Sequence, residues 1–456
     1  MMFVEIISNI LFVLALGYYF MTNMQWYSYK LNRVLFHHTK TWWHLVYFLI
    51  PLFLYFAFSL SQMSIIVTVA YMAALYHWRS GQDKKLVFTG RVKRFFAALL
   101  FFSIFMVMLK FVGVKYQSFA VFIPLLFAHF VSLMMEGMLF RGFQMKAEKK
   151  LEKMNDMIVV GITASYGKTS IKNYIAHILS AKYKTYATPR SVNTFGGVMK
   201  DINDDLPEDT EVYVVEMGAR GEGDIAEIST FVNPQYVVVG KIGPAHIEYF
   251  GSLENIRNTK MEILQSERLK EAWVHDSAMI KPEKHIHSFG REIHSIQATL
   301  DGLDFEMDGE SYHANILGAF NAMNIAAAIK VARALGMDEA TIQKQLETLE
   351  PTAHRLQRMD AGGKVIIDDS FNGNIDGMLE GFNLASTYEG RKVLITPGIV
   401  EVDDAFNVQV AERANEVFDV VVVTGDLNYK IFQENVDESK LVKLESKDKM
   451  QEMLVE

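Results

Sequence analysis

Apolar residues are concentrated in the first 145 residues of the chain, and this uneven distribution limits the possible folds more than any other feature. A helix needs about 20 apolar residues, within a range of roughly 17–25, to cross a bilayer. Five apolar runs precede residue 145, at 3–21, 45–60, 64–78, 95–112 and 119–140. The first, fourth and fifth runs have the required length, whereas the second and third form either two tight spans or one re-entrant hairpin. The pattern predicts a membrane α-helical region of about five helices over residues 1–145.

Lysine and arginine residues are grouped in alternate connections between these runs. They follow the first, third and fifth runs, whereas the other connections, near Ser61 and at 113–117, hold only Lys115. Basic loops of membrane proteins face the cytoplasm. We therefore expect a multi-pass protein of the bacterial inner membrane, with catalytic domains after Arg141 on the cytoplasmic side. A simple anchor and a groove for a lipid-linked substrate both remain open as roles for this region.

The charge and the cysteine content exclude several classes of protein. The formal net charge is −8, which argues against nucleic acid as a partner, because nucleic-acid binding needs a basic face. The chain has no cysteine. Disulfides, zinc–thiolate sites, iron–sulfur clusters and thiol nucleophiles are therefore excluded.

A phosphate-binding loop is predicted directly after the membrane region. Residues 157–163 form an apolar, β-branched run typical of a buried parallel strand, and an amphipathic stretch follows at 171–179. Between them lies a Gly-Lys-Thr sequence, and backbone N–H groups at a helix start bind anionic oxygens. Five residues separate Gly161 from Gly167, one more than in the usual phosphate loop. We expect ATP to be bound by Thr163, Ala164, Ser165, Gly167, Lys168, Thr169 and Ser170.

Further motifs follow in one order along the chain. They are GITASYGKT at 161–169, TPRSVNTFGG at 188–197, VVEMGA at 214–219, KIGPAHIEYFGS at 241–252, NTKMEI at 258–263, GAFNAMN at 318–324, HRL at 354–356 and DDSFNGN at 368–374. Together they resemble the motifs of the Mur ligase family, most closely those of members that add a terminal D-Ala-D-Ala dipeptide. The resemblance covers about residues 157–430. Ala164 replaces a usual glycine, and Ser191 replaces a usual asparagine.

The resemblance implies a role for each matched residue. Lys168 and Thr169 would hold the triphosphate and a first Mg²⁺, with Glu216 as a further ligand and His246 serving a second Mg²⁺. Lys260 matches a lysine that is carbamylated in several members. The predicted catalytic residues are thus Lys168, His246, Lys260 and Arg355, and the predicted metal ligands are Thr169, Glu216 and His246. Asn321 and Asn324 would contact the nucleotide base, and Arg355 with Asp369 would close over ATP.

The resemblance also implies the domain organisation and the reaction. We expect a membrane α-helical region at 1–145, a central α/β P-loop Mur-ligase domain at 146–351 and a smaller, shortened Rossmann-like domain at 352–456. The membrane region replaces the UDP-binding domain, and a basic linker at 146–153 follows it. The expected enzyme uses ATP and Mg²⁺ to join an amino acid or dipeptide to a carboxylate acceptor, UDP-linked or lipid-linked, of the cell envelope. A poly-γ-glutamate-type synthase and a non-catalytic nucleotide-sensing membrane scaffold are the alternatives.

Overall fold

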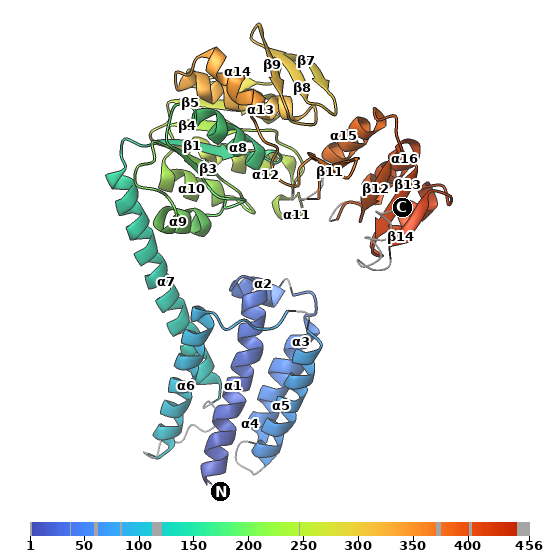
Figure 1. Ribbon diagram of the computed structural model, residues 1–456. Helices are drawn as coiled ribbons and strands as arrows, with labels where there is room; N and C mark the ends of the chain where they lie inside the picture. The colour runs from blue at the N-terminus through green and yellow to red at the C-terminus, as the bar shows by residue number, and fades with distance from the viewer. Residues whose placement is uncertain are drawn as a thin grey trace. The chain divides into compact units, whose positions relative to one another are not determined.

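The computed structural model describes residues 2–36, 38–58, 63–82, 84–111, 121–245, 247–370, 375–400 and 404–444. The chain divides into two compact units, Met1–Met145 and Lys146–Glu456 (Figure 1). The first is helical, and the second contains the described strands.

The first unit, called the helical unit below, is built around α1. Its elements are α1 (Met2–Trp26), α2 (Leu31–Phe36), α3 (Trp42–His44), the π-helical η1 (Leu45–Leu49), α4 (Ile50–Phe58), α5 (Met63–Ser80), α6 (Gly90–Phe111) and the start of α7 (Phe122–Lys153). Helix α1 packs against α5 and α6, and Phe12, Leu16 and Phe95 are fully buried between them. Gly17 allows the close approach of α6, because a Cβ atom there would come within 2.3 Å of Leu99.

Three described helices are long and apolar enough to cross a membrane by length and composition. They are Val4–Trp26, Gly90–Leu109 and Phe122–Lys153, which overlap the three runs predicted to have sufficient length. The described part of the second run, 45–58, lies in the shorter apolar helix Trp42–Phe58, and the third run lies in α5. The residues of the expected basic linker at 146–153 form the end of α7 as regular helix, and the two units divide at their start, between Met145 and Lys146.

The second unit contains a parallel six-stranded sheet. Its strands lie in the order β2-β3-β1-β4-β5-β6. They are β1 (Ile158–Thr163), β2 (Thr185–Ala187), β3 (Val212–Glu216), β4 (Tyr236–Val239), β5 (Glu271–His275) and β6 (Ile286–Phe289). Every neighbouring pair is parallel. Valine and isoleucine dominate β1, β3 and β4 because helices cover both faces of such a sheet. The prediction of a buried parallel strand at 157–163 is therefore confirmed.

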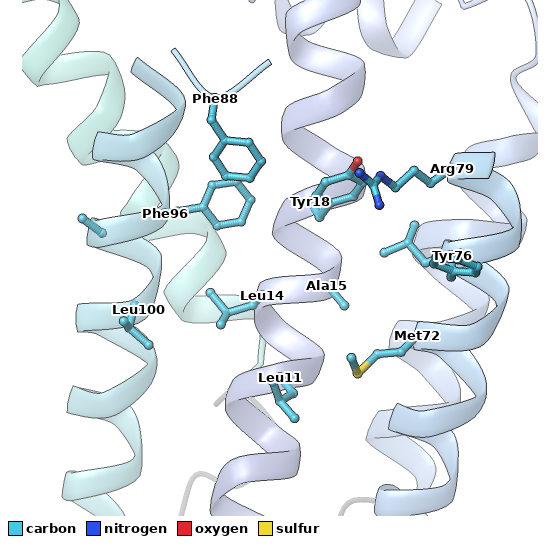
Figure 2. Close-up of a pocket in the computed structure, with 12 residues that line it drawn as sticks. Leu11, Leu14, Ala15, Tyr18, Met72, Tyr76, Arg79, Phe88, Phe96 and Leu100 are labelled. Atoms are coloured by element: carbon cyan, nitrogen blue, oxygen red, sulfur yellow. The ribbon is translucent and has the colours of Figure 1, made fainter. Parts of the chain in front are cut away.

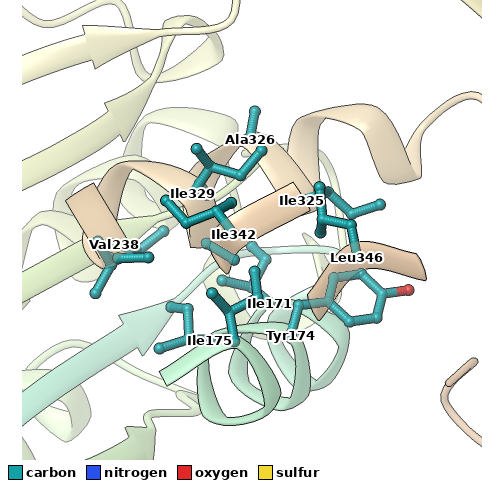
Figure 3. Packing of buried hydrophobic residues seen from close by; sticks show 14 of the residues in the cluster. Ile171, Tyr174, Ile175, Val238, Ile325, Ala326, Ile329, Ile342 and Leu346 are labelled. Carbon is teal, nitrogen blue, oxygen red and sulfur yellow. The ribbon is translucent and has the colours of Figure 1, made fainter. Parts of the chain in front are cut away.

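Two hydrophobic cores lie on the two faces of this sheet. Helices α9 (Phe195–Asp204), α10 (Asp224–Val232) and α12 (Leu253–Met261) cover one face. Helices α8 (Lys168–Leu179), α13 (Asn321–Ala334) and α14 (Glu339–Glu347) cover the other, with the antiparallel strands β7 (Ile293–Ala298), β8 (Leu303–Met307) and β9 (Glu310–Ala314). In Figure 3, Ile171 and Ile175 of α8 face Ile325 and Ile329 of α13. Short helices α11 (Ile247–Phe250), η2 (Glu262–Gln265) and η3 (Asp276–Ala278) complete this part.

The C-terminal part has its own small sheet and core. A hairpin of β10 (Gln357–Ala361) and β11 (Lys364–Asp368) precedes it. The following elements are α15 (Ile375–Ser386), β12 (Val393–Thr396), α16 (Asp404–Val417), β13 (Val420–Thr424), α17 (Tyr429–Asn435) and β14 (Leu441–Leu444). Strands β12, β13 and β14 are parallel.

Candidate active site

The phosphate-binding loop connects β1 to α8 at the carboxyl end of the central sheet. Gly167 precedes the first residue of α8 with a φ of 80°, a left-handed conformation that glycine adopts without strain. Its missing side chain also matters, because a Cβ atom at Gly167 would lie 2.5 Å from Oδ1 of Asn324. The loop is anchored by the Thr163 hydroxyl, which donates to the Met217 carbonyl at 2.9 Å, and by the Ser165 hydroxyl, which donates to the Gly243 carbonyl at 2.9 Å.

Lys168 folds back over this loop. Its Nζ atom donates to the carbonyl oxygens of Ala164, at 2.8 Å, and Ser165, at 3.2 Å. Burial lowers the pKa of Lys168, the negative charge of Glu216 opposes that shift, and the positive charge of Arg355 adds to it. A buried ammonium group at a helix start favours an anionic partner. The arrangement therefore suits a bound phosphate.

Thr169 and Glu216, the predicted metal ligands, are in direct contact. The Thr169 hydroxyl donates to Oε2 of Glu216 at 2.9 Å. The pairing of β1 with β3 brings Glu216 level with Ile162, at the end of the neighbouring strand. Mg²⁺ is commonly bound in proteins by one or two carboxylates together with substrate phosphates, and a threonine hydroxyl beside a carboxylate fits that pattern. Thr169 and Glu216 are therefore the residues that would hold the ion.

Sequence reasoning missed two further side chains around Glu216. The Asn193 amide donates to Oε1 of Glu216 at 3.0 Å, and Nζ of Lys172 lies 3.6 Å from Oε2. Asn193 belongs to the recognised segment 188–197 but had no assigned role. Lys172 follows Lys168 by four residues, a spacing that places both on one face of a helix. That spacing was the available signal.

Lys260 is buried in α12, with 4% of its side chain exposed. Burial and, to a smaller extent, the positive charge of Lys168 lower its pKa to about 7, while Asp224, Glu262 and Glu216 oppose the shift. These charges place Lys260 in the electrostatic environment of the loop. A lysine with such a pKa is largely neutral above pH 7, and a neutral amine is the form that reacts with carbon dioxide. Carbamylation of Lys260 stays a prediction.

Asn321 and Asn324 lie at the start of α13. The Asn321 amide donates to the Leu317 carbonyl at 2.8 Å, and its oxygen accepts hydrogen bonds from Tyr174 and Asn324, at 3.3 and 2.9 Å. These contacts hold the Asn321 side chain in place. The Asn324 side chain lies against Gly167. The predicted contact of this pair with the nucleotide base stays a prediction.

Residues from the start of the C-terminal part approach the same loop. The Arg355 charge influences the pKa values of both Lys168 and Tyr174. Burial raises the pKa of Asp369 to about 6, although the Leu356 N–H, which donates to it at 3.2 Å, and Arg355 both lower it. The structure thus brings Arg355 and Asp369 into one neighbourhood. Their predicted closure over ATP stays a prediction.

His246 lies outside the described residues, so its predicted roles in catalysis and metal binding have no structural counterpart here. Within the described ranges, no group of three or more histidine, cysteine, aspartate and glutamate side chains is arranged to hold a metal ion. The predicted magnesium site therefore consists of Thr169 and Glu216 in this part of the chain.

Comparison with known proteins identifies the central part of the second unit. Residues 162–332 match the Mur ligase middle domain. This part of the chain is therefore similar to the Mur ligase family. The match begins in β1 and ends in α13, so it contains the phosphate-binding loop, Glu216 and Lys260.

The similar proteins include several D-alanyl-D-alanine ligases. UDP-N-acetylmuramoyl-tripeptide–D-alanyl-D-alanine ligases of Synechocystis sp. and Bacillus subtilis are each 29% identical to it, over 53% and 54% of this chain. The matches span only 55% and 57% of those relatives. The MurF ligase of Thermotoga maritima, solved with ADP, is 25% identical with a TM-score of 0.58, covering 68% of this chain and 77% of that chain. The corresponding D-alanyl-D-alanyl ligase of Acinetobacter baumannii gives a TM-score of 0.63 at 24% identity, covering 69% and 73%. The predicted α/β Mur-ligase fold is therefore confirmed.

The predicted location is corrected by these comparisons. The chain was expected to be a multi-pass protein of the bacterial inner membrane with cytoplasmic catalytic domains, but its MurF relatives are soluble cytoplasmic enzymes. The prediction depended on the length and hydropathy of the N-terminal helices. Those properties are necessary for crossing a bilayer, but apolar helices of the same length also occur buried in protein.

The helical unit contains an apolar cavity of about 600 Å³. Side chains of α1, α5 and α6 line it, including Leu14, Met72 and Phe96. Figure 2 shows Arg79 pointing toward Tyr18 at one end of the cavity, with Leu11 nearer the other end. The groove alternative for this region stays a prediction.

Proposed function

We propose that this protein is a Mur ligase, an ATP-dependent carboxylate–amine ligase acting on a peptidoglycan precursor. The relatives' names supply the substrates, UDP-N-acetylmuramoyl-tripeptide as the acceptor and D-alanyl-D-alanine as the amine. The observation that carries the proposal is the 2.9 Å hydrogen bond between Thr169 and Glu216, directly beside Lys168. This contact joins a phosphate-binding loop to the carboxylate that a magnesium–nucleotide complex requires.

The reaction would proceed in two balanced steps. The acceptor carboxylate attacks the γ-phosphorus of ATP, which forms an acyl phosphate and releases ADP. The amine then attacks the acyl carbon, the amide bond forms, and inorganic phosphate and a proton leave. Both steps bring anions together, so fixed positive charges lower the barrier. Lys168 and Arg355 supply such charges, and bound Mg²⁺ would neutralise phosphate oxygens.

The proposed domain roles follow the same chemistry. Residues 146–351 would bind ATP, and residues 352–456 would contribute Arg355 and Asp369 and help to bind the amine. The positive charge of Arg355 contributes to the lowered pKa of Lys168. This influence on a residue of the phosphate-binding loop supports the division. The acceptor is proposed to carry UDP, and a lipid-linked acceptor is the alternative that the assay below separates.

The test is ADP release by the full-length protein in detergent. UDP-N-acetylmuramoyl-tripeptide and D-alanyl-D-alanine would be supplied together and singly, with a polyprenyl-linked acceptor and glutamate in parallel reactions. We expect release that requires both first substrates and falls by about 100-fold or more in Lys168→Ala, since fixed charges at the transferred phosphoryl group dominate such reactions.

The matched control is Lys182→Ala, because Lys182 also donates to two carbonyl oxygens, those of Leu335 and Gly336, but lies on the turn after α8. This variant should retain activity. Release with the polyprenyl-linked acceptor alone would reassign the acceptor, and release with glutamate alone would favour a poly-γ-glutamate-type synthase. ATP binding that Lys168→Ala abolishes, without stimulated release by any substrate, would replace the ligase with a nucleotide-sensing scaffold.

A further inference from the structure

Lys172 is a buried cation that the proposed reaction does not use. It lies in α8, one turn after Lys168, and only 1% of its side chain is exposed. Lysine is rarely buried to this degree without a partner, because removing an ammonium group from water costs several kcal/mol. A negatively charged or polar partner must therefore stabilise the Lys172 ammonium group in this position.

The partners of Lys172 come from two different segments. Its Nζ atom lies 3.6 Å from Oε2 of Glu216, whose side chain is also 1% exposed. The same atom donates a hydrogen bond to the carbonyl oxygen of Arg190, in the connection between β2 and α9. Burial lowers the pKa of Lys172, whereas Glu216 and Asp201 raise it. Lys172 thus joins the metal-binding carboxylate to the loop that carries Asn193.

Glu216 is consequently held on several sides. Thr169 and Lys172 face Oε2, and the Asn193 amide donates to Oε1. The backbone N–H of Glu216 donates to the Thr188 hydroxyl at 3.1 Å. A carboxylate with both oxygens engaged has little rotational freedom. Its orientation toward Thr169 is therefore set before any ion arrives.

We propose that Lys172 is a positioning residue for the magnesium site, fixing the Glu216 carboxylate and tying it to the Arg190 carbonyl. The inference rests on the proposed function only in assigning Glu216 to Mg²⁺. Residues that orient metal ligands contribute strongly to metal affinity. The magnesium-dependent part of nucleotide binding should therefore depend on Lys172.

The experiment measures ADP binding to the full-length protein by calorimetry, with Mg²⁺ and with EDTA. In Lys172→Met, we expect the gain in ADP affinity that Mg²⁺ provides to fall by about tenfold, as for other residues that support metal ligands. ADP affinity in EDTA should change by less than about twofold, because the partners of Lys172 are Glu216 and the Arg190 carbonyl and not residues of the phosphate-binding loop. Lys182→Met is the matched control and should keep the full magnesium effect.

A double-mutant cycle separates loss of the Lys172–Glu216 pairing from general loss of folding. Lys172→Met leaves Glu216 as a buried unpaired charge, so the variant is expected to be destabilised. Adding Glu216→Gln removes that charge, and the double variant should be more stable in urea than Lys172→Met alone. No recovery in the double variant would overturn the pairing, and an unchanged magnesium effect in a folded Lys172→Met would overturn the positioning role.

The binding measurement needs no turnover, so the two proposals fail separately. Magnesium-dependent ADP binding that is lost in Lys172→Met, together with no ligase activity in the native protein, would retain the inference and reject the ligase. Ligase activity in the native protein, together with a magnesium effect that Lys172→Met leaves unchanged, would support the ligase and reject the positioning role of Lys172.

Discussion

At the residue scale, the site depends on lysines held in unusual surroundings. Lys168, Lys172 and Lys260 are all placed where burial lowers their pKa values. Lys168 faces the loop carbonyls and Lys172 faces Glu216, but Lys260 has no ion pair of its own among the described contacts. The three lysines therefore differ in what replaces the lost hydration.

Lys260 should give the protein a distinct pH dependence of stability. Its pKa is about 7 in the folded chain and about 10.5 when unfolded, so the unfolded chain binds more protons between these values. Folding stability should therefore rise with pH across that window, by up to about 1.4 kcal/mol per pH unit from this group. Urea unfolding between pH 7 and 9 should show this rise in the native protein and a smaller one in Lys260→Met. Identical slopes in the two proteins would contradict the lowered pKa.

At the element scale, the β1–α8 connection requires a glycine at position 167 for two separate reasons. Gly167 supplies the left-handed backbone that ends the loop, and its missing side chain leaves room for Asn324 of α13. The contact links the start of α8 to the start of α13, two helices that share a hydrophobic core. The loop shape is thus determined by α13 as well as by the local sequence.

Gly167→Ala should damage this connection without disrupting the sheet. A left-handed conformation costs a non-glycine residue about 1–2 kcal/mol, and the added carbon would also displace Asn324. We expect lower stability in urea by at least that amount and weaker ADP binding measured by calorimetry.

Gly196→Ala is the control, because Gly196 lies in α9 with open space around its Cβ position. It should leave binding unchanged and stability equal or higher, since alanine favours helices. Equal ADP affinity in Gly167→Ala and the native protein would show that the loop tolerates another backbone conformation.

At the scale of the whole molecule, the second unit combines a tightly packed central core with thinner contacts to the C-terminal part. Leu317, Leu356 and Leu384 form a small apolar cluster between the two. Glu380 accepts a hydrogen bond from the Ala319 N–H at 2.7 Å, and Lys241 pairs with Asp376 at 2.9 Å. Few and partly exposed contacts suit domains that move during a reaction cycle.

The Lys241–Asp376 pair should contribute little to stability. About half or more of each side chain is exposed, at 52% and 61%, and surface ion pairs are worth up to about 1 kcal/mol. Lys241→Met should therefore change the free energy of unfolding in urea by less than about 1 kcal/mol. A loss well above that value would show that the two parts are held together more firmly than the contacts indicate.

The sequence by itself determined the features that depend on near neighbours in the chain. The apolar runs and the strand–loop–helix around Lys168 follow from local periodicity and from glycine at a turn. Motif resemblance added Glu216 and Lys260, which lie far from the loop in sequence. The inner-membrane location was wrong because helix length and hydropathy do not specify the surroundings of a helix.

Only the tertiary structure decided which distant residues meet. Glu216 reaches Thr169 because β3 lies beside β1 in parallel register, and strand order is not contained in the pattern of any single strand. The same arrangement buries Lys172 against Glu216 and brings Asn193 to its other oxygen. Burial and charge pairing depend on contacts between several elements at once. The local sequence therefore predicted the nucleotide loop, whereas the carboxylate's full set of partners required the fold.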